Sequence, residues 1–303
     1  MTGFARPAAA LSCALLLAAG CGGHAATNLP QDAALQTAAD SGRQSLDFGR
    51  LKQAAGQYQE AYKLALARDD ARAIGVTGYN LAVVQLAAND AAGALSTSLR
   101  TRDALVARGI ARYAELDLVE AAVLHRLSRD QDADLLAARA QATADDPAVR
   151  ARARASYVRG LIADTHGDAA GMTAALAGFG QPKQPSADWQ ADFDEITARL
   201  YLLRGECGKA AILARHVADI HRAQLDYRAM ADTLALAARA AQCGGASQEA
   251  ADFYLQAGES TASQGDNASA ARWAKQALRS GASPATRRAA TKMLAALRRS
   301  ARS

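Results

Sequence analysis

Histidines and clustered acids are the residues of this sequence that catalysis or metal binding would use first. His216 and His221 are five residues apart with Asp219 between them, whereas a zinc-binding helix carries two histidines at i and i+4 on one face. A metal site built from these three residues is therefore the weaker alternative. The clustered acids are expected at helix starts and interhelix turns, where the helix dipole favours negative charge: Asp69, Asp70, Asp145, Asp146, Asp192, Asp194 and Glu195.

The sequence also lacks the short motifs of common enzyme classes. It contains no Gly-x-Ser-x-Gly nucleophile turn, no His-Glu-x-x-His pair and no phosphate-binding glycine loop. We predict that the protein is not an enzyme and has no catalytic site, no metal, no cofactor and no small-molecule substrate.

The amino terminus has the pattern of an export signal. Arg6 precedes an apolar run from Ala8 to Leu17 that is interrupted only by Ser12. The run has the length of a signal-peptide core, and it is shorter than the ~20 apolar residues that a membrane-spanning helix needs. No later run is long and apolar enough to span a bilayer. Export of this kind excludes most nucleic-acid functions.

The segment Ala-Ala-Gly-Cys at 18–21 resembles a lipobox, the cleavage signal of bacterial lipoproteins. The resemblance implies cleavage before Cys21 and lipidation of its thiol, giving a signal peptide over 1–20 and a lipidated cysteine with a tether over 21–41. Gly22, in place of aspartate, implies transport to the outer membrane of a Gram-negative bacterium, with the protein facing the periplasm. The alternative is an ordinary secretory signal in which Cys21 is incidental.

Composition and breaker residues favour an all-α chain. About 80 of the 303 residues are alanine, hydrophobic residues make up 50% and aromatic residues 5%. Alanine is the best helix former, and this composition excludes a collagen-like chain, a disulfide-dense mini-protein and a low-complexity disordered chain. Glycine, asparagine and aspartate then divide the sequence into segments of helical periodicity. We predict about thirteen helices with short connections.

A recurring triplet relates these helices to one another. It consists of a small residue, a glycine or asparagine seven residues later, and an alanine five residues after that. Its matches are Gly49, Gly56 and Ala61; Ala82, Asn89 and Ala94; Ala198, Gly205 and Ala210; Ala238, Gly245 and Ala250; and Gly258, Gly265 and Ala270. Gly160 and Gly167 also fit, with Met172 in the last position. A decayed unit follows Ala122 and Arg129 and ends near Asp134. This spacing resembles the tetratricopeptide repeat (TPR) over about residues 42–300.

The resemblance implies a right-handed superhelix of antiparallel helix pairs with a concave peptide-binding groove. The repeats divide into 42–180 and 181–303 at the proline-rich segment 178–186, which is either a loop between repeats or a hinge. Groove positions in the clearest unit are Val76, Tyr79, Val83 and Leu86, although these side chains could equally belong to the core. The same positions in later units are Arg154, Tyr157, Asp164, Asp192, Glu195 and Arg199.

The two remaining cysteines are Cys207 and Cys243, which are 36 residues apart. This separation is close to one structural repeat, and each cysteine is expected at the end of a helical segment, so the two are expected in adjacent layers. An exported protein meets an oxidising compartment. We predict a candidate disulfide, and the alternative is a pair of buried free thiols that pack as small apolar groups.

Charge is concentrated at the carboxyl terminus. The chain carries +5 overall, but nine basic residues and no acidic residue follow Asp266. The expected contacts with an anionic surface are Arg287, Arg288, Lys292, Arg298 and Arg299. The alternative is a solvated terminal helix with a basic tail.

The sequence therefore predicts a membrane-anchored periplasmic lipoprotein that acts as a TPR-like scaffold for other envelope proteins. Its partners would be one or more envelope proteins in the helical-repeat groove and the membrane through the amino-terminal lipid, without nucleic acid. The alternative function is an envelope-assembly accessory that binds anionic lipid or glycan through its basic carboxyl-terminal helices.

Overall fold

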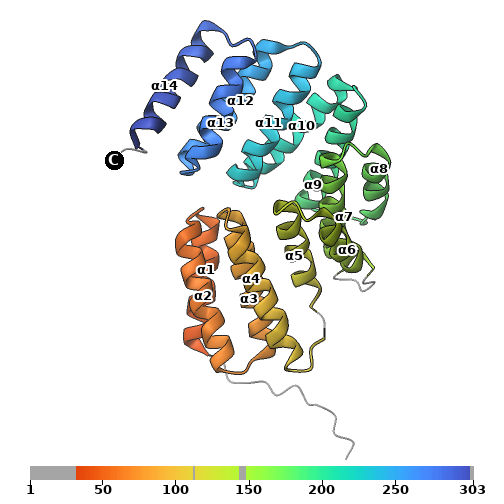
Figure 1. The fold of residues 1–303 in the computed structure, drawn as a ribbon, viewed down its shortest axis with the longest axis vertical. Coiled ribbons are helices and arrows are strands. Elements are labelled where there is room, and N and C mark those ends of the chain that lie inside the picture. Colours follow the sequence, from red (N-terminus) through yellow and green to blue (C-terminus); the bar gives the residue numbers. More distant parts are fainter. Residues whose placement is uncertain (1–31, 112, 143–147, 301–303) are drawn as a thin grey trace, which may run out of the picture. The chain divides into compact units, whose positions relative to one another are not determined.

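Fourteen α-helices and no strands make up the part of the chain that the structure, a computed structural model, describes: residues 32–111, 113–142 and 148–300 (Figure 1). The predicted signal peptide, Cys21 and Asp145-Asp146 lie outside these residues. The helices α1 to α14 fall in one compact unit. None of the described helices is long and apolar enough to cross a membrane.

The helices run in pairs along the sequence, and each odd-numbered helix is followed by its even-numbered partner. The odd-numbered helices are α1 Ala33–Asp47, α3 Ala71–Ala87, α5 Ala114–Arg126, α7 Ala148–Thr165, α9 Ala187–Leu203, α11 Tyr227–Cys243 and α13 Asn267–Arg279. The even-numbered helices are α2 Leu51–Ala67, α4 Ala91–Val106, α6 Asp130–Gln141, α8 Ala169–Gly178, α10 Cys207–Ala223, α12 Ser247–Ser263 and α14 Pro284–Ser300.

Each helix packs against the next one along the chain, and the odd-numbered helices form a second set of contacts. Helix α3 packs against α5, α5 against α7, α7 against α9, and α9 against α11. At the carboxyl end, α14 packs against both α13 and α12. Stacked pairs of this kind, in which each unit contacts its neighbours, define an all-α solenoid.

The turn inside each pair contains one residue with a positive φ. These residues are Gly49, Asn89, Ser128, Gly167, Gly205, Gly245 and Gly281, with φ between 59° and 79°. In the turn between α9 and α10, the Glu206 N–H donates to the Tyr201 carbonyl at 2.8 Å across Gly205. A left-handed residue that closes a helix end in this way reverses the chain within a few residues. This local geometry produces the helix pairs.

Two predicted triplets are wrong in register. Gly56 lies inside α2, because the left-handed position is Gly49, with the small residue Gly42 seven residues before it and Ala54 five residues after it. In the third pair the left-handed residue is Ser128 rather than Arg129, whose φ is −99°. The buried partners there are Ala121 and Ala133, both fully buried.

The corrected register makes the repeat more regular. In the first six pairs, the fifth residue after the left-handed residue is Ala54, Ala94, Ala133, Met172, Ala210 and Ala250, and each of these is fully buried. Successive members are therefore 38 to 40 residues apart. The predicted triplet Gly258, Gly265 and Ala270 belongs instead to the connection between α12 and α13, and the last pair uses Gly281.

Small residues let neighbouring helices approach closely. A Cβ atom on Gly160 of α7 would lie 2.9 Å from Ile196 Cδ1 of α9, closer than carbon atoms pack. Likewise, a Cβ atom on Gly42 of α1 would lie 3.0 Å from the Tyr58 ring of α2. The high alanine content therefore reflects tight helix packing as well as helix propensity.

The helical array begins earlier than predicted. Residues 33–41 were expected in the tether, but they form the first part of α1, in which Ala38 and Gly42 are buried. Helix α1 packs against α2, so its small residues belong to the helical array and not to the tether. The tether can extend no further than Asp32.

The proline-rich segment 178–186 is a loop that aromatic packing attaches to the next pair. Phe179 is fully buried, and its ring lies edge-on to Trp189 and Phe193 with centroids 6.0 Å and 5.5 Å away. The Trp189 indole N–H donates to the Phe179 carbonyl at 3.4 Å. Helix α7 packs against α9 across this loop, so the repeat continues through it.

Candidate interaction surface

The predicted groove residues of α3 divide between surface and core. Val76 is 41% exposed. Tyr79, Val83 and Leu86 are partly buried and pack against a core cluster that includes Leu116 of α5. Val76 is therefore open to a partner, whereas the other three side chains help to attach α3 to α5.

One residue per repeat occupies the position of Val76, six residues before the small residue of the triplet. We call this set the odd-helix row, and it consists of Val76, Glu115, Arg154, Asp192 and Asp232. All but Asp192 are exposed. The helices that carry them, α3 to α11, contact one another in order, so the row runs across five helices with one apolar, one basic and three acidic side chains.

Arg154 connects the row between α7 and α9. Its Nη1 donates to Asp192 Oδ1 at 3.0 Å, and its Nη2 lies 4.0 Å from Asp188 Oδ2. The Arg154 side chain is 47% exposed, whereas that of Asp192 is 8% exposed. Burial raises the pKa of Asp192 to about 7, although the guanidinium of Arg154 lowers it and the nearby Glu195 raises it further.

A second set of bonds lies one helical turn further along the same two helices. Tyr157 Oη donates to Glu195 Oε2 at 3.0 Å, and Arg199 Nη2 donates to Glu195 Oε1 at 2.6 Å. Arg199 Nη1 also donates to Asp164 Oδ2 at 2.8 Å. The i,i+4 pairing of Glu195 with Arg199, expected from the sequence, is therefore present, and it extends to α7.

Burial dominates the ionisation of these groups. The pKa of Tyr157 is raised well above its usual value, because its hydroxyl is buried and lies beside the charge of Glu195. Burial acts to lower the pKa of Arg199, but the charges of Glu195 and Asp164 outweigh it and raise this pKa overall. Arg199 is therefore a permanent cation that neutralises the two carboxylates between α7 and α9.

Charges from three other helices converge at Asp232 of α11. Its pKa is raised by burial and by the charge of Glu195, and it is lowered by Arg126 of α5, Arg272 of α13 and Arg199 of α9. The Asp232 side chain still contacts water. Its pKa is raised because many protein atoms surround it. The carboxyl end of the row is thus a recessed, charged surface.

The expectation that Asp192, Asp194 and Glu195 mark a helix start is wrong. They lie in the middle of α9 and are 6%, 8% and 5% exposed. A signal for their role was present in the sequence, because Arg154 and Asp192, like Tyr157 and Glu195, are 38 residues apart. Complementary polar residues that lie one repeat apart on odd-numbered helices are therefore predicted to contact each other.

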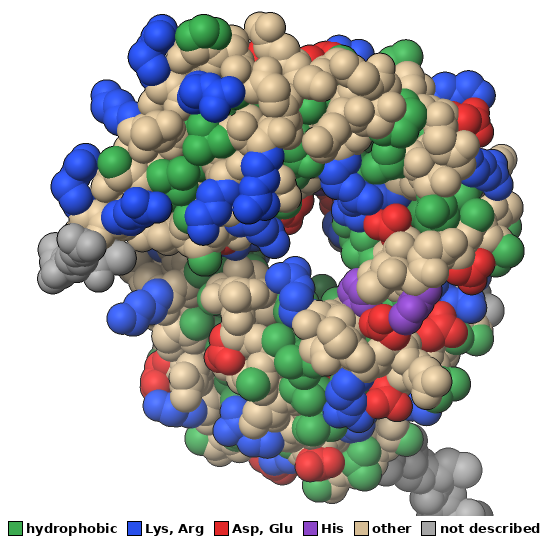
Figure 2. All heavy atoms as spheres, turned by 45° about the horizontal axis from the view of Figure 1, so that its top comes forward, with side chains coloured by type: hydrophobic (Ala, Val, Ile, Leu, Met, Phe, Trp, Pro, Cys, Tyr) green, Lys and Arg blue, Asp and Glu red, His purple; other side chains and the backbone are tan. Residues whose placement is uncertain are grey.

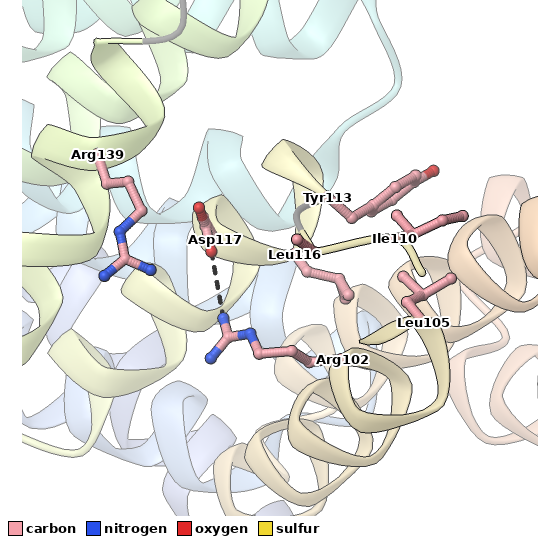
Figure 3. A pocket seen from close by; sticks show the side chains of 8 residues that line it. Arg102, Leu105, Ile110, Tyr113, Leu116, Asp117 and Arg139 are labelled. Carbon is pink, nitrogen blue, oxygen red and sulfur yellow. Dashed lines mark hydrogen bonds and ion pairs between the residues drawn. The ribbon is translucent and has the colours of Figure 1, made fainter. Parts of the chain in front are cut away.

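A small cleft between α4, α5 and α6 also carries buried charge, which the sequence analysis missed (Figure 3). Its volume is about 130 Å³. Arg102 Nη2 lies 3.2 Å from Asp117 Oδ1 and 2.5 Å from Glu120 Oε2, and Arg139 enters from α6. Burial raises the pKa of Glu120, while the charge of Arg102 lowers it. The remaining walls are apolar, with Leu105, Ile110, Ala111, Tyr113 and Leu116.

Two histidines that the sequence analysis left unassigned share one carboxylate. His125 Nδ1 lies 2.8 Å from Asp130 Oδ1, and His166 Nε2 lies 2.8 Å from Asp130 Oδ2. Hydrogen bonding with His125 is the main cause that lowers the pKa of Asp130. The contact joins α6 to the ends of α5 and α7, so it is a link between neighbouring repeats.

The weaker alternative of a histidine metal site is not supported. His221 is buried and its Nδ1 has no hydrogen-bond partner, whereas His216 is largely exposed, with Nε2 3.9 Å from Asp194 Oδ2. Among the described residues, no group of three or more His, Cys, Asp or Glu side chains has the arrangement of a metal site.

Cys207 and Cys243 are joined by a disulfide. Cys207 begins α10 and Cys243 ends α11, and their Cα atoms are 5.6 Å apart, a usual separation for bonded cysteines. The bond links the fifth helix pair to the sixth at the turns. It lies at the end of these helices, away from the middle of the odd-helix row.

Comparisons with known proteins find similarity only among solved structures. No protein-family model and no curated protein matches the chain. A tetratricopeptide repeat protein from Parabacteroides merdae is 15% identical, with a TM-score of 0.45, over 87% of this chain and 98% of that one.

Two further structures are more distant. The TPR2AB domain of yeast Sti1, solved as a complex with pHSP90, is 12% identical with a TM-score of 0.33, over 81% of this chain and 98% of that one. A TPR repeats protein from Bacteroides fragilis is 13% identical with a TM-score of 0.29, over 81% and 97%. The fold is a TPR-like α-solenoid. That assignment depends on the helix pairs, the turns and the period of this chain, because these scores are too low to carry it.

The predicted basic contacts gather at the carboxyl end of the array. Arg287, Arg288, Lys292, Arg298 and Arg299 all lie on α14 and are exposed. Figure 2 shows Lys and Arg side chains spread over the carboxyl-terminal helices at the upper left. Helix α14 is the last of the described helices, and it packs against α13 and α12.

Proposed function

We propose that this protein is a binding scaffold that holds a segment of another protein along the odd-helix row. The observation that carries the proposal is the row itself, which crosses five helices in successive contact and exposes a side chain from four of them. Packed helices lie about 10 Å apart, so four steps span about 40 Å. This length matches about twelve residues of extended polypeptide, and it exceeds the reach of a small ligand.

The chemistry of the row favours a segment of mixed character. Val76 at one end is apolar and exposed, whereas Arg154 and Asp232 further along are charged. The buried bonds of Tyr157, Glu195 and Arg199 fix α7 against α9, so the exposed groups are held on a rigid support. A preorganised surface of this kind loses little conformational freedom on binding.

We further propose that the scaffold works in the bacterial envelope, lipidated at Cys21 and facing the periplasm from the outer membrane. The apolar run before Cys21 and the small residues at 18–20 support this assignment. The bond between Cys207 and Cys243 fits an oxidising compartment. In this proposal the protein has no catalytic role.

Position-specific crosslinking tests the row. A photo-reactive amino acid would replace Val76, or Ile212 on the even-numbered helix α10 as a control, since both are exposed apolar positions of 41% and 62%. We expect one protein adduct in intact cells from position 76 and none from position 212. An Asp232→Arg change in the position-76 chain should reduce this adduct. Equal labelling from both positions would contradict binding along the row.

Metabolic labelling with an alkyne fatty acid tests the anchor. The wild-type chain should incorporate the label and fractionate with outer membranes, and Cys21→Ser should lose both properties. A Ser12→Ala change within the apolar run serves as the control and should leave labelling intact. Labelling that persists in the Cys21→Ser chain would disprove lipidation at this thiol, without bearing on the row.

A further inference from the structure

The last two helices place all their basic residues on the side away from the core. In α13, Ala270, Ala274 and Ala277 are fully buried. The basic residues Arg272, Lys275 and Arg279 are exposed at i, i+3 and i+7, which places them opposite those alanines. The outer face of α13 is therefore a row of three cations.

Helix α14 repeats the arrangement. Its buried side carries Thr286, which donates to Asp252 Oδ1 at 2.6 Å, and the fully buried Ala290. Arg288, Lys292 and Arg299 are exposed on the opposite side at i, i+4 and i+11. Arg287 and Arg298 flank this stripe. Together, α13 and α14 present eight cations, which we call the basic face: Arg272, Lys275, Arg279, Arg287, Arg288, Lys292, Arg298 and Arg299.

Little of the charge of this face is offset within the described part of the protein, where Arg272 acts electrostatically on Asp232 and Asp266. None of the eight cations forms an ion pair there, although Arg272 lies over the Trp273 ring at 4.1 Å. Residues 267–300 contain no acidic side chain, so the two helices carry +8. Elsewhere in the array, arginines such as Arg102 and Arg199 are bonded to carboxylates. What distinguishes these two helices is that they carry eight cations and no acidic side chain.

The face also lacks the apolar groups that a protein interface requires. The large hydrophobic side chains that are exposed in the described residues all lie before α12, and the last is Tyr227. Trp273, Leu278 and Met293 on the same helices pack instead against the core. Protein interfaces obtain most of their affinity from buried aromatic and aliphatic anchors. A lipid bilayer surface requires only distributed cations.

We propose that the basic face of α13 and α14 binds the headgroups of an anionic phospholipid membrane. Attraction between many cations and a layer of negative headgroups adds up without a shaped pocket, and it weakens as salt screens it. The basic face shares no residue with the odd-helix row, although the charge of Arg272 reaches Asp232 at the carboxyl end of that row, and its contact with the membrane does not depend on a lipid at Cys21. The proposal therefore stands or falls independently of the proposed scaffold function.

Vesicle binding by the unlipidated chain tests this inference. The mature chain from residue 21, carrying Cys21→Ser, would be sedimented with vesicles of phosphatidylethanolamine containing phosphatidylglycerol, and with vesicles of phosphatidylcholine alone. We expect binding only to the anionic vesicles, and a loss of about tenfold or more in affinity between low and high salt.

Charge reversal then locates the contact. The variant Arg288→Glu/Lys292→Glu should bind the anionic vesicles about thirtyfold more weakly, because each cation near the surface contributes to the affinity. The control Lys52→Glu/Arg72→Glu changes the net charge equally at two exposed residues outside the basic face and should bind as the parent does. All four side chains are exposed, and thermal melts followed by circular dichroism would verify that both variants fold.

Two outcomes would overturn the proposal. One is equal weakening in both double variants, which would mean that net charge rather than the basic face drives binding. The other is no binding to anionic vesicles while an acidic polypeptide such as polyglutamate binds and is competed by salt. That result would identify the partner as an acidic protein.

Discussion

At the residue scale, Asp192, between α7 and α9, is a strongly perturbed carboxyl group. Asp192 is 8% exposed in its side chain and has a pKa raised from 3.8 to about 7, mainly by burial. The neutral form is thus favoured in the folded protein. A raised carboxyl pKa contributes stability below pH 4, and this contribution is lost as pH rises through 7.

Replacement of Asp192 by asparagine should remove this pH dependence. The free energy of unfolding of the wild type, relative to Asp192→Asn, should fall by about 2 to 4 kcal/mol between pH 4 and pH 7.5. Arg154 loses its partner in the variant, but its half-exposed guanidinium can be hydrated. Urea denaturation at both pH values measures the difference. Parallel pH profiles of the two proteins would show that Asp192 is ionised in the fold.

Arg199 is the cation that stabilises the charges of Glu195 and Asp164. It bonds to both Glu195 and Asp164, and its side chain is 17% exposed. Arg199→Met should destabilise the protein by about 3 to 5 kcal/mol, because it leaves buried charges without a partner. The double variant Glu195→Gln/Arg199→Met should recover more than half of this loss. Equal destabilisation in the two variants, measured by urea denaturation, would argue against a charge penalty.

The residues of this cluster were accessible from the sequence only in part. The TPR-like register placed Arg154, Tyr157 and Glu195 at groove positions, and repeat spacing brings them together. The burial of Glu195 was not predictable, because nothing local distinguishes it from an acid at a helix start. The cleft at Arg102 depends on the angle between α4 and α5, which no sequence pattern gives.

At the element scale, the turns determine the fold, and most of them could be predicted. Glycine or asparagine marks the left-handed position in all of the within-pair turns except that at Ser128. The register errors arose where a glycine occurs inside a helix, as Gly56 does, or where serine replaces glycine. In both cases the periodicity of the flanking apolar residues indicates the helix ends better than the position of a glycine does.

Leu225 lies in the turn between α10 and α11 and allows the free-energy cost of a left-handed turn residue to be measured. Its φ is 61°, and its side chain is 65% exposed, so it adopts a left-handed conformation without packing in return. Leu225→Gly should raise the free energy of unfolding by about 0.5 to 1 kcal/mol, since glycine has no Cβ penalty there. Gly205→Ala, at φ 75°, should lower it by about 1 to 2 kcal/mol. Thermal melts of the two variants should shift in opposite directions, and shifts of the same sign would contradict the turn argument.

At the scale of the whole molecule, stability is distributed along the array. Each helix packs mainly against its neighbours in sequence, with the odd-numbered helices adding contacts one repeat away. Solenoids of this type have stabilities that are approximately the sum of their repeats and interfaces. A local change should therefore affect the surrounding pairs more than distant ones.

The disulfide between Cys207 and Cys243 offers the sharpest test of this distribution. It closes a loop of 36 residues that contains most of α10 and α11, and chain-entropy arguments give a bond of this span about 3 to 4 kcal/mol. In the Cys207→Ser/Cys243→Ser chain, hydrogen exchange should accelerate in α9 to α12, which meet at the bonded turns. Protection in α1 to α4 should be unchanged, because these helices pack mainly against one another and against α5 rather than against the bonded pairs. If protection fell equally throughout, the array would unfold as one cooperative unit, and the additive description of its stability would be wrong.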